Sequence, residues 1–265
     1  MKEASTKPKN KQIPYISFPV KEIFNILGLI NQKEPIDKSD LINKIALKIK
    51  RKEKTSQEII ISLRNLGLIK MAQKKVELTD RAKNIEDVPT FKKFILNKKY
   101  VKDMIKSIHI LEERKVFNQS TEDYFSSLLN VLEEKFNYKK VALRVIDRFI
   151  TLFRFLKIID YDNFMDRYYI VNDNISKGRF KKEIKNVYKG LLSNKTTWVR
   201  IPQLRSNVIS NIKISRDKFK KLFIDLLDSN KNFEVASASI VRDEVKKFGL
   251  KKDKKIYFYL KIRGS

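Results

Sequence analysis

The chain has 265 residues, of which 59 are Lys or Arg and 31 are Asp or Glu, so its formal net charge is +28 and its pI is near 10.0. A hydrophobic fraction of 42% matches ordinary globular proteins, which excludes a disordered basic tail and places the excess charge on the surface of a folded chain. Without cysteine and with one histidine, the chain cannot build disulfides, thiolate metal sites, cysteine nucleophiles or histidine clusters.

Such a charge favours nucleic acid as the partner, because a polyanion relieves the self-repulsion of a strongly basic surface. The alternatives are an acidic protein or membrane surface, or an AT-rich genome, although that bias should raise Glu together with Lys. No apolar stretch is long enough to span a bilayer, and the N-terminus lacks a signal-peptide core. We therefore expect a cytoplasmic protein, nucleoid-associated if it binds DNA, with no membrane contact.

Residues 1–17 are expected to form a flexible basic arm, and residues 18–88 a first domain. Apolar residues at helical spacing predict one helix over residues 19–30 and a second that begins at residues 37–40. A third helix is predicted to be capped by Thr55 or Ser56, with Glu58 completing a capping box from Thr55, and to end at Gly67.

A hairpin follows, with strands at residues 68–71 and 76–79 around a turn at residues 72–75, and then a closing helix from residue 80. The run TSQEIIISLRNLGLIK at residues 55–70, followed by VELT at residues 76–79, resembles winged-helix transcription regulators. In that family a capped recognition helix ends in a Leu-Gly-Leu-Ile-type turn, and a β-hairpin wing closes on a Leu-Thr pair. The resemblance covers about a quarter of the chain. It implies the winged-helix fold and DNA binding, without identifying a particular family.

The same order of elements is expected twice more. Residues 89–119 are predicted to be a helical connector, and residues 120–175 a second winged-helix-like domain with helices at 120–136 and 138–156 and strands at 157–161 and 167–171. Residues 176–265 are predicted to form a third, basic winged-helix-like domain. Its expected helices are 180–192, 202–212 and 216–227, its strands 199–201, 233–236 and 256–260, and residues 239–255 an enlarged wing. The predicted fold class is mainly α with short β-hairpins (α+β), in tandem winged-helix domains.

Charge is unevenly distributed, with +8 in residues 1–88, +4 in residues 89–175 and +16 in residues 176–265. A uniform genome bias would not produce this asymmetry. We therefore expect the two outer domains to contact nucleic acid, and the middle one to pack, to space them or to bind protein partners.

The candidate nucleic-acid contacts lie on or beside the last expected helix of each domain and on the wings. In the first domain, side chains away from the core face of that helix and at the wing tip are Ser56, Gln57, Ile61, Arg64, Lys74 and Lys75. In the second domain, one helical stripe carries Lys139, Lys140, Arg144 and Arg148, whereas the acidic wing, with Asp160, Asp162 and Asp166, favours a structural or protein-contacting role.

In the third domain, the start of the helix capped by Ser215 should attract phosphate through its amides and dipole. Residues around it are Arg205, Lys213, Ser215, Arg216, Lys218, Lys220 and Lys221. The enlarged wing adds Arg242, Lys246, Lys247, Lys251, Lys252, Lys254 and Lys255. Because lysines dominate, we expect mostly phosphate contacts and modest sequence specificity. The best candidates for recognising bases are Gln57, Arg64, Arg205 and Arg216.

We expect no enzyme activity, cofactor or metal, because no phosphate-binding glycine loop, metal motif or nucleophile elbow is present. Glu244, Val245 and Lys246, with Asp225 or Asp228, match half of a nuclease site, a pattern that arises easily by chance in so Lys-rich a chain. The prediction is a double-stranded DNA-binding protein. The alternatives are a plasmid-type replication initiator, a DNA-recruiting subunit of a mobile-element or phage-defence complex, a sequence-specific repressor, and an RNA-binding protein.

Overall fold

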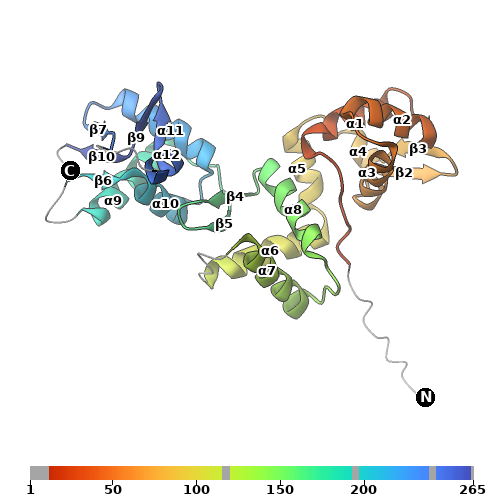
Figure 1. The fold of residues 1–265 in the computed structure, drawn as a ribbon, viewed down its shortest axis with the longest axis horizontal. Coiled ribbons are helices and arrows are strands. Elements are labelled where there is room, and N and C mark those ends of the chain that lie inside the picture. Colours follow the sequence, from red (N-terminus) through yellow and green to blue (C-terminus); the bar gives the residue numbers. More distant parts are fainter. Residues whose placement is uncertain (1–11, 115–119, 193–196, 239–242, 264–265) are drawn as a thin grey trace, which may run out of the picture. The chain divides into compact units, whose positions relative to one another are not determined.

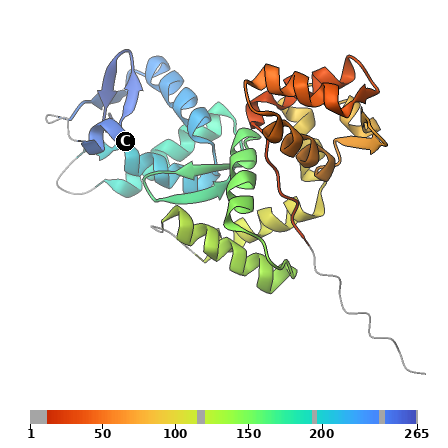
Figure 2. The ribbon, with the colours of Figure 1, turned by 45° about the vertical axis from the view of Figure 1, so that its right-hand side comes forward.

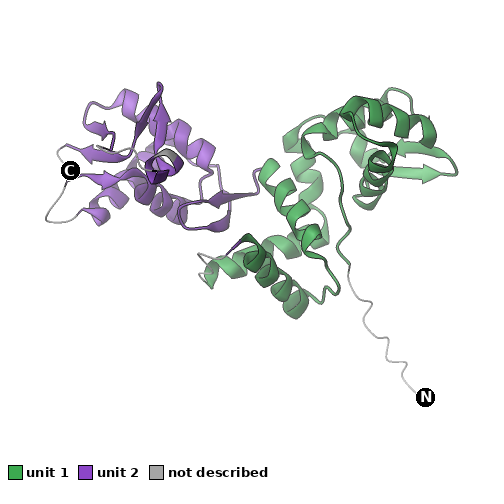
Figure 3. Cartoon of the chain, viewed as in Figure 1, with its two compact units in different colours: residues 1–114, 121–156 green, residues 115–120, 157–265 purple. Residues whose placement is uncertain are grey.

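A computed structural model describes residues 12–114, 120–192, 197–238 and 243–263. The chain is mainly helical with small antiparallel strand pairs, which confirms the expected α+β class. It divides into two compact units (Figure 3): unit 1 comprises Met1–Arg114 and Thr121–Leu156, and unit 2 comprises Lys115–Ser120 and Lys157–Ser265. No described helix is long and apolar enough to cross a membrane.

Unit 1 begins with the order helix, strand, helix, helix, hairpin (Figure 1). The elements are η1 Val20–Glu22, α1 Ile23–Asn31, β1 Ile36–Asp37, α2 Lys38–Ile49, α3 Glu53–Asn65, β2 Ile69–Ala72, β3 Lys75–Leu78 and α4 Asp80–Lys83. Both strand pairs are antiparallel, and the sheet order is β1–β3–β2. The sequence predicted the helices and the hairpin but missed β1, because two residues are too few to show a period.

The core of this part explains why the elements form where they do. Ile23, Ile26, Leu27 and Ile30 recur along α1 at helical spacing, and all four are buried. Gly67, at φ +72°, follows the last turn of α3 and lets the chain reverse into β2, as expected for a glycine after a helix.

The flexible arm predicted over residues 1–17 is too long, because its last residues belong to the fold. Its residues 1–11 lie outside the described residues, but Ile13 and Ile16 are buried. The backbone N–H of Ser17 donates to the Ser62 hydroxyl at 2.7 Å. The segment of residues 12–17 is therefore part of the fold, since two isoleucines gain more from burial than from remaining in water.

The remainder of unit 1 is helical, with α5 Val88–Leu96, α6 Lys99–Glu113, α7 Thr121–Phe136 and α8 Leu143–Phe155. Asp87 caps α5 in a capping box with Thr90, whose hydrogen bonds lower the pKa of the Asp87 carboxyl. In its described residues, the connector expected at residues 89–119 consists of the two helices α5 and α6. Helix α7 packs against both α6 and α8.

Unit 2 contains β4 Ile159–Asp162, β5 Arg167–Ile170, α9 Lys177–Leu191, β6 Val199–Arg200, α10 Ile201–Ile212, α11 Arg216–Ser229, β7 Phe233–Ala236, α12 Asp243–Phe248, β8 Leu250–Lys252, β9 Lys255–Tyr257 and β10 Tyr259–Ile262. A three-stranded sheet has the order β6–β10–β7, and the pairs β4–β5 and β8–β9 are separate hairpins. The single strand expected at residues 256–260 is divided between β9 and β10, with the buried Phe258 between them.

The boundary between the units falls inside the segment 120–175 that the sequence assigns to a middle domain. Helices α7 and α8 belong to unit 1, whereas β4 and β5 belong to unit 2, beside its helices (Figure 2). Tyr169 of β5 and Ile175 are buried in the core of unit 2. The hairpin is held by the side chains it buries, and sequence order alone does not reveal to which helices they pack.

Candidate nucleic-acid interface

Helix α3 begins earlier than expected, and this changes which side chains it exposes. Its first residue is Glu53, and it follows Lys52, which has extended backbone and no side-chain cap. The predicted capping box of Thr55 and Glu58 is therefore wrong. Ser56 falls on the inner stripe with Ile59, Ile60 and Leu63, and it is 0% exposed. Ser56 cannot contact a ligand.

The outer stripe of α3 is exposed along its whole length and carries polar and basic side chains around one apolar residue. Lys54, Gln57, Ile61 and Arg64 recur every three or four residues, and all four are exposed. Ile61 is 48% exposed and lies at the middle of this stripe. Gln57 and Arg64 thus occupy the outward positions that the sequence predicted, whereas Lys54 was missed because the helix was expected to begin after it.

Three consecutive cations precede α3. Lys50, at φ +52°, ends α2, and Lys50, Arg51 and Lys52 are all exposed in the turn between the helices. With Ala46 and Leu47 they line a surface pocket of about 570 Å³. The run KIKRKEK at residues 48–54 is the signal in the sequence that could have identified this turn.

The hairpin of unit 1 contributes fewer free charges than expected. Its turn, with Gln73 at φ +54°, exposes Lys74 and Lys75. Lys75 forms an ion pair with Asp37 at 2.8 Å, whereas Lys74 forms no ion pair with any described residue. Lys74 is thus the cation that the hairpin tip offers to a ligand.

The basic stripe expected along residues 139–148 does not form as predicted, because α8 begins at Leu143. Lys139 and Lys140 lie in the preceding loop, where Lys140 has φ +58°. Arg144 lies in the first turn of the helix, and its guanidinium lies over the Tyr15 ring at 5.2 Å. The loop is fixed by Tyr138, whose hydroxyl donates to the buried Asp103 carboxylate at 2.9 Å.

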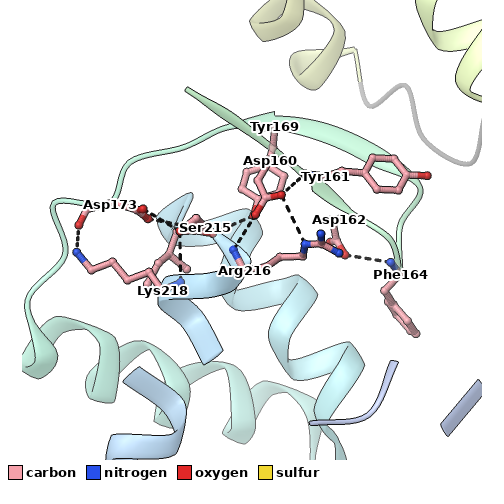
Figure 4. A network of polar contacts seen from close by, with 10 residues as sticks. Asp160, Tyr161, Asp162, Phe164, Tyr169, Asp173, Ser215, Arg216 and Lys218 are labelled. Atoms are coloured by element: carbon pink, nitrogen blue, oxygen red, sulfur yellow. Dashed lines mark hydrogen bonds and ion pairs between the residues drawn. The ribbon is translucent and has the colours of Figure 1, made fainter. Parts of the chain in front are cut away.

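In unit 2, the start of α11 is occupied by carboxylates of the chain itself (Figure 4). Ser215 caps the helix as expected, but its N–H and hydroxyl donate to Asp173 at 2.8 and 2.7 Å. The Arg216 N–H donates to Asp160 at 2.8 Å, and its guanidinium lies 3.5 Å from the same carboxylate. The Lys218 ammonium donates to the Asp173 carbonyl oxygen. The prediction that this helix start is open to phosphate is therefore wrong.

The two arginines expected to read bases in unit 2 are also unavailable. Burial lowers the pKa of the Arg205 guanidinium below its ordinary value, and the nearby Asp162 opposes this shift. Asp162 is fully buried and accepts hydrogen bonds from the Ser206 hydroxyl and the Phe164 N–H. Arg216 is held by Asp160 as described above. The acids of the β4–β5 hairpin thus form internal contacts, Asp160 with Arg216 of α11 and Asp162 with Ser206 of α10.

The remaining candidates of unit 2 differ in their accessibility. Lys213 is half-buried at φ +56° where α10 ends, and Lys252 pairs with Asp228. The exposed lysines are Lys220, Lys221, Lys247, Lys251, Lys254 and Lys255. Arg242 and the Lys246 side chain lie outside the described residues. The β8–β9 hairpin and α11 therefore keep part of their expected charge, on lysines alone.

The carboxylates of the hypothetical nuclease site are found in separate ion pairs. Glu244 lies 3.8 Å from Arg200, Asp225 lies 3.0 Å from Lys177, and Asp228 pairs with Lys252. Within the described residues, no group of three or more His, Cys, Asp or Glu could hold a metal ion.

Comparison with protein-family models, curated proteins and solved structures found no match for this chain.

Proposed function

We propose that the chain is a non-enzymatic double-stranded DNA-binding protein built from two winged-helix domains, one in each unit. The order α1, β1, α2, α3, β2, β3 in unit 1 corresponds to α9, β6, α10, α11, β7, β10 in unit 2, where α12, β8 and β9 are inserted between β7 and β10. In both units the first strand pairs with the third, and the third with the second. Two separate segments with one topology support a repeated domain, whereas residues 120–175 do not form a third.

The observation that carries the proposal is the basic surface at the start of α3. The turn residues Lys50, Arg51 and Lys52 continue into the outer stripe that begins with Lys54. An α-helix fits the major groove of B-DNA, and its N-terminal amides and dipole favour the anionic backbone. Cations at that same end would bind the phosphates that flank the groove.

The rest of the α3 stripe has the chemistry to read bases. Gln57 can form two hydrogen bonds with adenine, and Arg64 can form two with guanine. Lys74, at the hairpin tip, is suited to a phosphate. Because lysines outnumber such side chains, binding in this proposal is mostly electrostatic, with modest sequence selectivity.

Duplex RNA fits this surface less well, because the major groove of A-form RNA is too narrow to admit a helix. A second candidate is a DNA-recruiting subunit of a larger assembly. It is favoured by Leu47, which is 79% exposed beside the cationic turn and would be covered by a protein partner.

The test is binding of the full chain to a labelled duplex, measured by fluorescence anisotropy for the unchanged protein and two triple variants. In the first, Arg51, Lys52 and Lys54 become Glu; acidic residues in the first turn suit the helix dipole, so the fold should persist. In the control, the exposed Lys99, Lys102 and Lys106 of α6 become Glu, which changes the net charge equally.

We expect the first variant to lose at least tenfold in affinity relative to the control, since each lost phosphate contact weakens binding. Equal affinities of the two variants would contradict the proposal. Circular dichroism of both variants verifies that their helix content is unchanged.

A further inference from the structure

Helix α9 of unit 2 has two opposite faces of different character. Its buried face carries Phe180, Ile184, Val187 and Tyr188. The opposite face carries Arg179, Lys182, Lys185 and Lys189, all exposed. At about 100° per residue, these four cations fall within an arc about 120° wide that is centred opposite the buried stripe.

These cations have no carboxylate partner in the described part of the chain. Three other charged groups of α9 are engaged elsewhere: Lys177 lies 3.0 Å from Asp225, the Lys181 ammonium donates to the Asn230 amide oxygen, and Glu183 accepts from the Asn211 amide at 2.7 Å. Arg179, Lys182, Lys185 and Lys189 form no ion pair with a described residue. The outer face of α9 therefore carries four uncompensated positive charges.

Four acids of unit 2 are engaged with residues outside α9. Asp160 and Asp173 hold the start of α11, Asp228 binds Lys252, and Glu234 binds Arg263. These four carboxylates of unit 2 are thus engaged away from α9, whose outer face carries a row of cations.

The dimensions of the row suit a phosphate backbone. Lys189 lies ten positions after Arg179, which corresponds to about 15 Å along the helix axis. One DNA strand advances about 3.4 Å per phosphate along its axis, so a row of this length can follow about four consecutive nucleotides.

We propose that the outer face of α9 is a second DNA-binding surface, which holds the phosphate backbone of duplex DNA without reading bases. In unit 2 it replaces the helix start of α11, where Asp160 and Asp173 already lie. The identity of the partner rests on the proposed function, whereas the location of the surface rests on α9 alone.

A basic row can also be an ordinary solvated face, and α6 offers the comparison. It has the same length as α9 and exposes Lys99, Lys102 and Lys106 at the same spacing. That row continues to His109 and Glu113, whose side chains lie 3.3 Å apart, so its end is not cationic. We expect the α6 row to be solvated and the α9 row to bind DNA. Because the two rows have the same spacing, α6 serves as the control for α9.

The experiment uses the full chain and a labelled duplex in a salt series, with Lys182, Lys185 and Lys189 changed to Glu in one variant and Lys99, Lys102 and Lys106 in the other. The two variants have the same net charge and differ only in location. A second pair with Gln in place of Glu removes the charges without introducing repulsion. Circular dichroism and the melting temperature show whether each variant is folded.

We expect the α9 variant to bind at least tenfold more weakly than the α6 variant. The slope of log K against log salt should fall by about 2 to 3, since each released phosphate contact contributes about 0.9. In the pair with Gln, the α9 variant should again bind more weakly than the α6 variant, with smaller losses of affinity than in the pair with Glu.

Equal affinities and equal slopes in both pairs would overturn this inference while leaving the α3 surface intact. The proposed function fails separately, if the variant of Arg51, Lys52 and Lys54 equals its control. Failure of the unchanged chain to bind duplex DNA would overturn both.

Discussion

At the scale of single residues, burial decides which side chains of α3 can act, and Ser56 illustrates this. It is 0% exposed, and its hydroxyl has no hydrogen-bond partner among the described residues. An unsatisfied buried hydroxyl costs about 1–3 kcal/mol, and alanine is a better helix former by a few tenths of a kcal/mol. Ser56→Ala should therefore raise the melting temperature and leave duplex affinity unchanged, as measured by thermal unfolding and anisotropy. A loss of affinity comparable to that of Arg64→Ala would contradict the burial of Ser56.

Ile61 is the apolar side chain on the outer stripe of α3. In the proposed docking it would contact the methyl group of a thymine, the apolar feature of the major groove. We expect deoxyuridine in place of thymine to weaken binding by the unchanged chain several-fold and to have no effect on Ile61→Ala. The measurement is a four-way comparison of two proteins with two duplexes. Equal losses on deoxyuridine substitution in both proteins would show that Ile61 does not contact the methyl group.

The residues that sequence reasoning misplaced are those whose partners lie far away in the chain. Arg216 was expected to read bases, but Asp160, 56 positions earlier, binds it. Ser215 was expected to leave its helix start open, but Asp173, 42 positions earlier, fills it. Local patterns identify a helix start and its cap, but they carry no information on a carboxylate that tertiary packing brings to it.

At the scale of elements, apolar periodicity predicted the helices well, because each buries one stripe. The starts of α3 and α8 were less predictable, since Lys52 and Ala142, which precede these helices, provide no side-chain cap. The two-residue strand β1 has no readable pattern. Assignment of the β4–β5 hairpin to unit 2 depends on Tyr169, which is buried there and donates to the Ile214 carbonyl oxygen at 3.0 Å.

At this scale, the hydrogen bonds of the Asp173 carboxylate lead to a prediction about the free energy of unfolding. The carboxylate accepts two hydrogen bonds from Ser215, and hydrogen bonds to a charged group contribute roughly 1–3 kcal/mol. Asp173→Asn should lower the free energy of unfolding by about that amount. The control is Asp217→Asn, an exposed acid in the first turn of the same helix, which should have a smaller effect through the helix dipole.

The same pair of variants tests the role of the α11 start. In our proposal the contacts of Asp160 and Asp173 at the start of α11 hold the β4–β5 hairpin in the core of unit 2 and do not bind DNA. Asp173→Asn and Asp217→Asn should therefore bind duplex DNA equally. Denaturant unfolding and anisotropy measure the two properties. A gain in affinity specific to Asp173→Asn would show that this carboxylate competes with phosphate, contrary to our account.

At the scale of the whole molecule, the central feature is a net charge of +28. Exposed cations lie at the turn before α3 in unit 1, and along α9 and the β8–β9 hairpin in unit 2. The sequence correctly indicated a surplus of charge and the expected α+β class. It could not indicate which cations are neutralised, because that depends on the ion pairs of the folded units.

The most direct test of the account is the affinity of the full chain for duplex DNA, single-stranded DNA and duplex RNA across 50 to 200 mM salt. With about six phosphates engaged, we expect affinity for duplex DNA to fall about a thousandfold over this range. Duplex DNA should be preferred over the other two at every salt concentration. No binding to any of the three at 50 mM salt, or a preference for duplex RNA, would contradict the account.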